Sequence, residues 1–193
     1  MLYSIGKFLF RVIFSVFFRY KAIGTSNVPA QGPVVLCCNH TSLLDPPLLG
    51  SPLKRKVYFM AKAELFNVPI LGTLISKVGA FPVKRGGVSK ESIRLAIQLL
   101  KDGNAMGIFP EGSRSNAGGM GKKGAASLAI KSGAAVVPVA IVGNYSLFRR
   151  MTIIYGRPMD IRQFEGASSD DLEQATDLIM TEIRAIHAAH SKA

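Results

Sequence analysis

A histidine and an aspartate, His40 and Asp45, stand five residues apart where an apolar run ends and two prolines follow. On a regular helix their side chains would point about 140° apart, because each residue advances about 100°. In a turn that leaves a strand, the chain can bring the carboxylate back to the imidazole. Such a contact would fix the tautomer, raise the basicity of the histidine and leave one ring nitrogen as a proton acceptor. The pair therefore fits a general base with its orienting carboxylate, or two polar residues in an ordinary loop.

The residues around this pair predict a strand, a turn and the start of a helix. The apolar run 33–38 is the expected strand, and Pro46 disfavours the helical conformation for the residue before it, which makes Asp45 a natural N-cap. Two adjacent cysteines, Cys37 and Cys38, fall in this strand. Neighbours in a strand point to opposite faces, so we expect two small buried thiols and no disulfide between them.

Two further loops carry charged residues, each after a predicted apolar strand. One contains Lys84 and Arg85, and the other contains Glu111 and Arg114. In a sheet of parallel strands the active loops lie at the strand ends, and cations in such loops could hold a phosphate.

A glycine-rich stretch follows the second of these loops. Gly119, Gly121 and Gly124 match a dinucleotide-binding fingerprint in spacing, but they follow a loop instead of a strand and no acidic residue lies about 20 residues further on. Lys122 and Lys123 open the next helix. They could contact a phosphate or a donor substrate at the helix N-terminus, or they could form a solvated basic turn.

Short apolar runs alternate with helical patterns along most of the chain. Strands are expected over 33–38, 56–60, 79–83, 105–109, 135–141 and 151–155, and helices near 69–77, 88–101, 122–132 and 169–188. Ser89 and Ser169 are possible N-caps. This alternation predicts an α/β fold, a single layered domain with a largely parallel central sheet flanked by helices. At 193 residues the chain is long enough to bury one core.

Residues 1–18 are strongly apolar and contain five of the 11 phenylalanines. Lys7 and Arg11 interrupt the run, which argues against both a signal peptide and a membrane-spanning helix. Wound as a helix, the segment has one narrow polar stripe, formed by Ser4, Lys7, Arg11, Ser15 and Arg19. That pattern is typical of an amphipathic helix in a membrane interface; the alternative is a first helix packed on the protein's own core. We expect residues 1–24 to associate with a membrane and residues 25–193 to form the α/β domain.

The formal net charge is +12, from 24 Lys and Arg against 12 Asp and Glu. Such a chain is attracted to anionic surfaces, which include phospholipid head groups, nucleic acids and acidic proteins. Because the phenylalanines gather near the N-terminus instead of alternating with lysines, a nucleic acid is not the expected partner. His187 and His190 lie near the end of the last predicted helix, where histidine is ordinary, and nothing indicates a metal.

Four motifs resemble, in order, the conserved blocks of the glycerolipid acyltransferase family that includes the 1-acylglycerol-3-phosphate acyltransferases. They are NHTSLLD at 39–45, GAFPVKR at 79–85, FPEGSRS at 109–115 and VVPVAI at 136–141. The first block alone is a weak signal, whereas four blocks in the family's order are a specific one. One small departure is Ser113, which stands where threonine is commoner.

This resemblance implies a role for each matched residue. His40 would be the general base for the acceptor hydroxyl, and Asp45 would orient it. The residues that would bind the glycerol phosphate of the acceptor are Arg85, Glu111, Gly112, Arg114 and, by proximity, Lys84. The nucleophile elbow of serine hydrolases is absent, so neither Ser42 nor Cys38 is expected to carry the acyl group.

The implied reaction moves a fatty acyl group from acyl-CoA or an acyl-carrier protein to the free hydroxyl of 1-acylglycerol-3-phosphate, lysophosphatidic acid, and yields phosphatidic acid. No cofactor or metal is required besides the acyl donor. The alternatives are another lysophospholipid or glycerol-3-phosphate as acceptor, or a non-catalytic membrane-binding module. We expect a peripheral or monotopic protein at the cytoplasmic face of the cell membrane, with anionic phospholipids as its partner.

Overall fold

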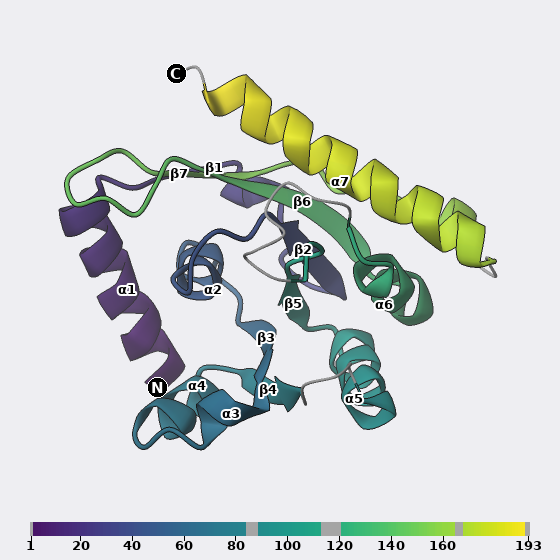
Figure 1. Cartoon of the computed structure of the whole chain (residues 1–193), viewed down its shortest axis with the longest axis horizontal. Helices are drawn as coiled ribbons and strands as arrows, with labels where there is room; N and C mark the ends of the chain where they lie inside the picture. The colour runs from purple at the N-terminus through teal and green to yellow at the C-terminus, as the bar shows by residue number, and fades with distance from the viewer. Residues whose placement is uncertain (1, 84–88, 113–120, 165–167, 192–193) are drawn as a thin grey trace.

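The structure is a computed structural model that describes residues 2–83, 89–112, 121–164 and 168–191. Within these residues one sheet has the strand order β1-β7-β6-β2-β5-β3-β4 (Figure 1). Its strands are β1 (Lys21–Ile23), β2 (Val34–Cys38), β3 (Val57–Lys62), β4 (Ala80–Val83), β5 (Ala105–Ile108), β6 (Ala135–Val142) and β7 (Thr152–Tyr155). All neighbouring strands are parallel except β6 and β7, which confirms the largely parallel α/β sheet.

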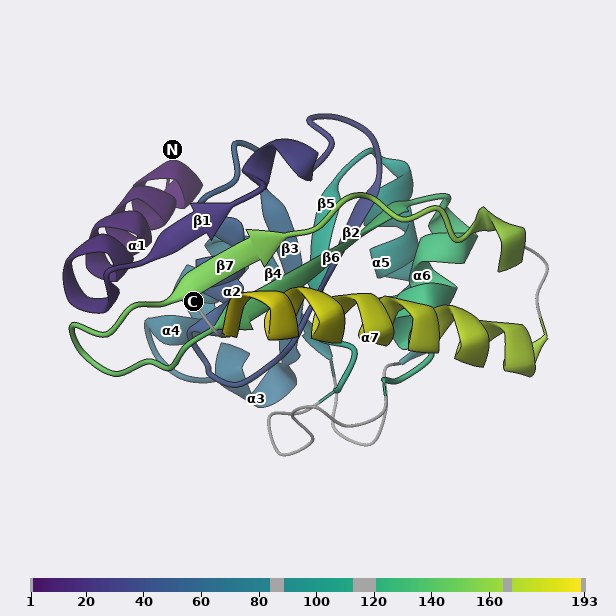
Figure 2. The ribbon, with the colours of Figure 1, turned by 90° about the horizontal axis from the view of Figure 1, so that it is seen from above.

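Helices cover both faces of this sheet (Figures 1 and 2). They are α1 (Leu2–Phe18), α2 (Asp45–Gly50), α3 (Ala63–Phe66), α4 (Leu71–Lys77), α5 (Lys90–Lys101), α6 (Gly124–Ser132) and α7 (Ser169–Ser191). Helices α1 and α2 contribute to the core on one face, and α5, α6 and α7 contribute to the core on the other. The described residues also include two short 3-10 helices, Thr25–Asn27 and Arg162–Phe164.

The central strand β2 is buried on both faces, as a parallel strand between two helical layers must be. Cys37 packs in the core under α5, α6 and α7, whereas Cys38 packs in the core under α1 and α2. Both thiols are free and buried. The prediction that they point to opposite faces without a disulfide is confirmed.

Helix α1 packs on the core and also faces solvent. Phe14 is fully buried and Phe18 is nearly so, and Lys7 Nζ donates a hydrogen bond to the carbonyl oxygen of Leu53 at 2.7 Å. The opposite side of the helix exposes several large apolar residues, among them Phe8, 69% exposed. For the part of the chain that the structure describes, no helix is both long and apolar enough to cross a bilayer.

Strand β1 and helix α3 were not predicted. Strand β1 has three residues, too few to show a period of two, and it exists because it pairs with β7 at the register Lys21 to Thr152. Helix α3 is a single turn of four residues. Elements this short depend on contacts with distant segments instead of on a local pattern.

Candidate active site

His40 and Asp45 meet just beyond the carboxyl end of β2. His40 Nδ1 lies 2.7 Å from Asp45 Oδ2, and the same oxygen accepts hydrogen bonds from the backbone N–H groups of Thr41 and Ser42, each at 2.7 Å. A carboxylate oxygen surrounded by donors indicates that Nδ1 carries the hydrogen, so Nε2 is the nitrogen that can accept a proton. Asp45 is fully buried, whereas 17% of the His40 side chain is exposed. The ring is therefore partly accessible from solvent.

The expectation that Asp45 caps helix α2 is wrong. The helix begins at Asp45 itself, the N-cap position belongs to Leu44, and no side chain caps it. The carboxylate turns back toward the preceding residues instead, because the N–H groups of Thr41 and Ser42 and the His40 ring lie on that side. The Asp45 side chain therefore contacts the histidine and does not cap the helix.

The second carboxylate oxygen of Asp45 is held by a residue that the sequence analysis did not identify. The Tyr145 hydroxyl, in the loop between β6 and β7, donates to Asp45 Oδ1 at 2.5 Å. Burial, and then the charge of Asp45, raises the pKa of Tyr145 well above its usual value, so the hydroxyl stays protonated and remains a donor. Tyr145 also contacts Phe18 of α1 edge-on, with ring centroids 5.8 Å apart. A spacing of 100 residues between the tyrosine and Asp45 left no local signal for this contact.

The third block supports the histidine from two sides. Phe109 stacks on the His40 ring with the centroids 4.1 Å apart and the planes inclined by 23°. Glu111 Oε2 accepts a hydrogen bond from the backbone N–H of His40 at 3.0 Å, and the Glu111 side chain is buried. These contacts fix both the ring and the backbone of His40.

Asn39 ties the first block to the fourth. Its Nδ2 donates to the carbonyl oxygen of Ile141 at 3.0 Å, and the Ile141 N–H donates to Asn39 Oδ1 at 2.7 Å. The amide thus replaces one step of backbone pairing beyond the end of β2, where β6 continues. This reciprocal pair is the physical reason for an asparagine immediately before the histidine.

Three of the predicted phosphate-binding residues, Lys84, Arg85 and Arg114, lie outside the described residues, and their role stays a prediction. The strands before their loops, β4 and β5, run parallel within the sheet that contains β2. Because parallel strands end at the same edge, both loops begin on the side of the sheet that carries His40. The topology thus brings the three loops to one edge.

The two lysines at the start of α6, Lys122 and Lys123, make different contacts, and Gly112 lies beside the first of them. Gly112 has a φ of +74°, and a Cβ on it would lie 2.7 Å from Lys122 Cε, so the Lys122 stem passes over this glycine. The Lys122 backbone N–H also donates to the carbonyl oxygen of Pro110 at 2.8 Å. Lys123 Nζ instead contacts Glu173 Oε2 at 3.0 Å and Ser169 on α7. Of the two lysines, Lys122 is the one whose described contacts are with the third block. A phosphate-binding role for either lysine stays a prediction.

The family described as Acyltransferase matches residues 19–142, which span all four blocks. The chain belongs to the acyltransferase family. It is 36% identical over 160 residues to the 1-acyl-sn-glycerol-3-phosphate acyltransferase of Bacillus subtilis, which covers 80% of each chain. It is 31% identical over 168 residues to the enzyme of the same name from Streptococcus pneumoniae, covering 83% of this chain and 63% of that protein. The crystal structure of the 1-acyl-sn-glycerophosphate (LPA) acyltransferase, PlsC, from Thermotoga maritima matches with a TM-score of 0.71 at 26% identity, over 96% of this chain and 78% of that one.

In an acyltransferase the acyl group can pass through an enzyme nucleophile or go directly to the acceptor. Burial, followed by the negative charge of Asp45, raises the pKa of the Cys38 thiol well above its usual value, so a reactive thiolate is disfavoured. Ser42 Oγ accepts a hydrogen bond from the backbone N–H of Leu44 at 3.2 Å and belongs to the turn. Among the described residues, no group of three or more His, Cys, Asp or Glu side chains could hold a metal ion. These observations do not support an acyl-enzyme on Cys38 or Ser42.

Proposed function

We propose that this acyltransferase moves a fatty acyl group from acyl-CoA or an acyl-carrier protein to the free hydroxyl of 1-acylglycerol-3-phosphate, which yields phosphatidic acid. The observation that carries the proposal is the 2.7 Å contact between His40 Nδ1 and the buried Asp45 carboxylate, at the carboxyl end of a strand that runs parallel to β5 and β6. The named relatives act, by their names, on this acceptor.

In the proposed reaction, His40 Nε2 takes the proton of the acceptor hydroxyl while its oxygen attacks the carbonyl carbon of the thioester. The carbon–sulfur bond then breaks, and the thiolate leaves with the bonding electrons. Asp45 stabilises the imidazolium that forms, and four hydrogen-bond donors hold its carboxylate in place. A positioned base contributes a rate factor of about 10²–10⁴. The thiolate can take the proton back from the ring, so no acyl-enzyme and no cofactor is needed.

The acceptor phosphate would be bound by the cations of the second and third blocks, Arg85 and Arg114, with Lys84 beside them. Lys122 can join them, because its stem lies over Gly112 at the start of the third loop. For Glu111 we propose a positioning role, because its buried carboxylate accepts a hydrogen bond from the backbone N–H of His40.

The protein would act at the cytoplasmic face of the cell membrane, where both acyl donors are available and where the acceptor and product reside. Support comes from the exposed apolar side of α1 and from the net charge of +12, which favours anionic phospholipids.

The test is a product assay with purified protein, in which lysophosphatidic acid, another lysophospholipid and glycerol-3-phosphate are each combined with each donor and the lipids are separated by thin-layer chromatography. We expect phosphatidic acid from lysophosphatidic acid, and His40→Ala should reduce its formation at least about 100-fold while binding to liposomes persists. Turnover by His40→Ala at the normal rate would refute the base. Binding without turnover by the unaltered protein would favour the non-catalytic module.

A further inference from the structure

Most of the large apolar side chains that the described residues expose lie in three segments. Twelve of fifteen belong to α1, to the 68–74 stretch that leads into α4, and to the 147–148 turn. They are Ile5, Phe8, Leu9, Val12, Val16, Phe17, Val68, Ile70, Leu71, Leu74, Leu147 and Phe148. We call these twelve residues the apolar face. Single exposed apolar residues are normal, but a concentration of this kind marks a binding surface.

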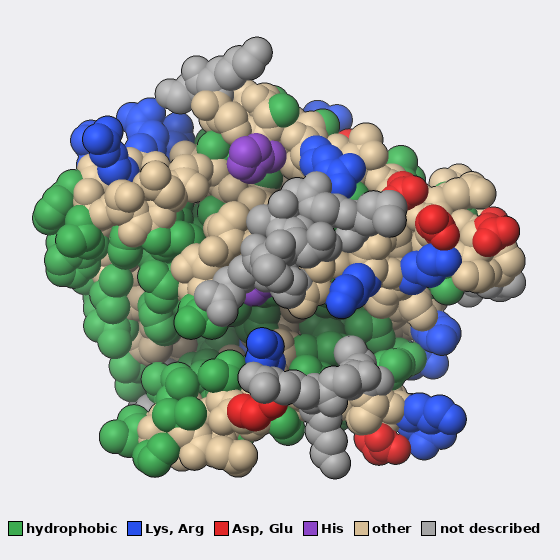
Figure 3. All heavy atoms as spheres, in the orientation of Figure 1, with side chains coloured by type: hydrophobic (Ala, Val, Ile, Leu, Met, Phe, Trp, Pro, Cys, Tyr) green, Lys and Arg blue, Asp and Glu red, His purple; other side chains and the backbone are tan. Residues whose placement is uncertain are grey.

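The three segments are contiguous. The Phe148 backbone N–H donates to the carbonyl oxygen of Phe17 at 2.6 Å, which fastens the 147–148 turn to the end of α1. Near the start of α1, a Cβ on Gly6 would lie 3.6 Å from a methyl group of Val78, the residue that follows α4. Hydrophobic side chains cover the side of the molecule where α1 and α3–α4 lie next to each other (Figures 1 and 3). The face is therefore one surface and not three separate patches.

Backbone strain is concentrated at the same surface. The non-glycine residues with positive φ among the described residues are Arg19, Ile70 and Phe148, with φ of 40°, 65° and 62°. A β-branched residue at positive φ is a steric outlier, and Ile70, with a ψ of −53°, lies outside the left-handed helical region as well. Ile70 is 85% exposed and Phe148 is 64% exposed, so burial of these side chains within the chain does not offset the strained conformation. The strain instead presents both side chains outward, as a feature retained for function would.

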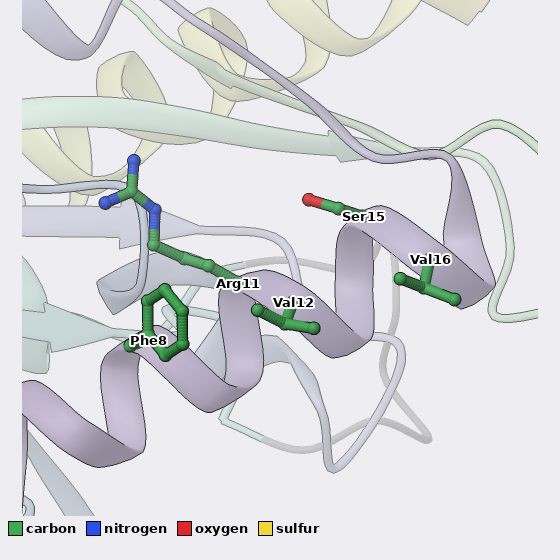
Figure 4. A pocket seen from close by; sticks show the side chains of 5 residues that line it. All are labelled: Phe8, Arg11, Val12, Ser15 and Val16. Carbon is green, nitrogen blue, oxygen red and sulfur yellow. The ribbon is translucent and has the colours of Figure 1, made fainter.

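The surroundings of the face are cationic. Lys77, Arg149 and Arg150 are exposed beside its segments, whereas the acidic residues within 1–90 are the buried Asp45 and the exposed Glu64, and none occurs in 143–159. On the outer side of α1, a hollow of about 340 Å³ is lined by Phe8, Arg11, Val12, Ser15 and Val16 (Figure 4). An apolar surface with cations among and around it fits an acyl-chain layer beneath anionic head groups. A second copy of the chain would bring like charges together.

We propose that the apolar face binds an anionic phospholipid bilayer as a single unit, with Ile70 and Phe148 inserted alongside α1. Membrane contact then has three points instead of one helix, which fixes the orientation of the domain on the bilayer. The proposal rests on the membrane association in the proposed function and adds the 68–74 and 147–148 segments to it.

Flotation with vesicles tests the proposal on the full-length protein. The vesicles are phosphatidylcholine with phosphatidylglycerol, and pure phosphatidylcholine serves for comparison. Ile70→Asn and Phe148→Asn are informative changes, because asparagine is among the non-glycine residues found most often at positive φ, and circular dichroism verifies that each variant keeps the fold. Each should lower the partition coefficient on the anionic vesicles about tenfold or more, because the lost burial is that of a whole side chain. Leu178→Asn, a change at a similarly apolar exposed position on α7, is the matched control and should not change it.

A second measurement reports insertion directly. Because Cys37 and Cys38 are buried, an environment-sensitive dye can be attached to Ile70→Cys alone, and its emission should shift to the blue on anionic vesicles. The same dye on Leu178→Cys should show no shift.

The other outcomes separate this inference from the proposed function. Unchanged binding by Ile70→Asn and Phe148→Asn, with reduced binding by Phe8→Asn, would overturn the three-point face but keep α1 as the membrane element. No vesicle binding by the unaltered protein would overturn both. A concentration-dependent dimer in light scattering that Ile70→Asn dissociates, without any change in vesicle binding, would assign the face to a second copy. Acyl transfer by the unaltered protein is measured separately and does not depend on these results.

Discussion

Tyr145→Phe is the most selective perturbation of the proposed catalytic pair, His40 and Asp45, because it removes one hydroxyl and keeps the ring. In the native protein this hydroxyl donates to Asp45 Oδ1 at 2.5 Å, while the three N–H donors approach Oδ2. The change leaves a buried carboxylate oxygen without its tyrosine donor and allows the carboxylate to turn relative to the imidazole.

A hydrogen bond to a charged group contributes about 1.5–3 kcal/mol. If half of this is expressed in the transition state, where the imidazolium needs a fixed carboxylate, kcat should fall about 3- to 10-fold, since 1.4 kcal/mol corresponds to a factor of ten. KM for the acceptor should change little, because Tyr145 has no assigned contact with the phosphate. The free energy of unfolding should fall by about 1–3 kcal/mol.

The assay is steady-state acyl transfer to lysophosphatidic acid, combined with urea unfolding. Tyr155→Phe is a matched control, because the Tyr155 hydroxyl is also buried but donates to the carbonyl oxygen of Leu49 at 2.6 Å. It should lower stability and leave kcat unchanged. The reasoning is refuted if Tyr145→Phe retains full kcat, or if both variants reduce kcat equally.

Three further changes probe the same framework. Asn39→Ala removes both hydrogen bonds to Ile141 and should lower the free energy of unfolding by about 1–3 kcal/mol, measured by urea unfolding, and lower kcat with it; stability equal to the unaltered protein would contradict the pairing. Gly112→Ala places a Cβ against the Lys122 stem at a position with positive φ. We expect the free energy of unfolding to fall by about 1–2 kcal/mol and KM for the acceptor to rise. Unchanged stability and KM would argue against Lys122 as a phosphate contact. Burial raises the pKa of Cys37 to about 12, so its thiol deprotonates more readily in the unfolded chain. The contribution of Cys37 to the free energy of unfolding should therefore be fully present below about pH 8.5 and be lost as the pH rises toward about 12. Cys37→Ala should make the free energy of unfolding, measured from about pH 8 to 11, depend less on pH.

Much of the architecture was predictable, because the pattern that defines it is local. The strands that were expected near 33–38 and 135–141 are continuous apolar runs, and both are interior strands of the sheet. Helix α5 begins after Ser89, whose side chain accepts from the Ser92 N–H as an N-cap should. Periodicity and capping act within a few residues, and a sequence displays them directly.

Helix α1 and the turn at Asp45 show that a local sequence pattern does not decide which partners a residue meets in the fold. The polar stripe of residues 1–18 did not reveal that α1 serves the core and the surface at once, because which arc is buried depends on the sheet beneath it. Asp45 has the residue type and the following proline of an N-cap, yet its carboxylate satisfies the turn and the histidine instead. Both decisions are made by partners that come from elsewhere in the fold.

By itself, the amino-acid sequence determined the α/β class, the order of most elements and the candidate base and carboxylate, because apolar period, turn residues and motif spacing are properties of neighbouring residues. Only the tertiary structure decided that Tyr145 completes the environment of Asp45, that Phe109 and Glu111 brace His40, and that three distant segments share one apolar face. Hydrogen bonds and stacking act over a few ångströms in space, and the folded sheet brings together residues that are about 70 to 140 positions apart in the chain.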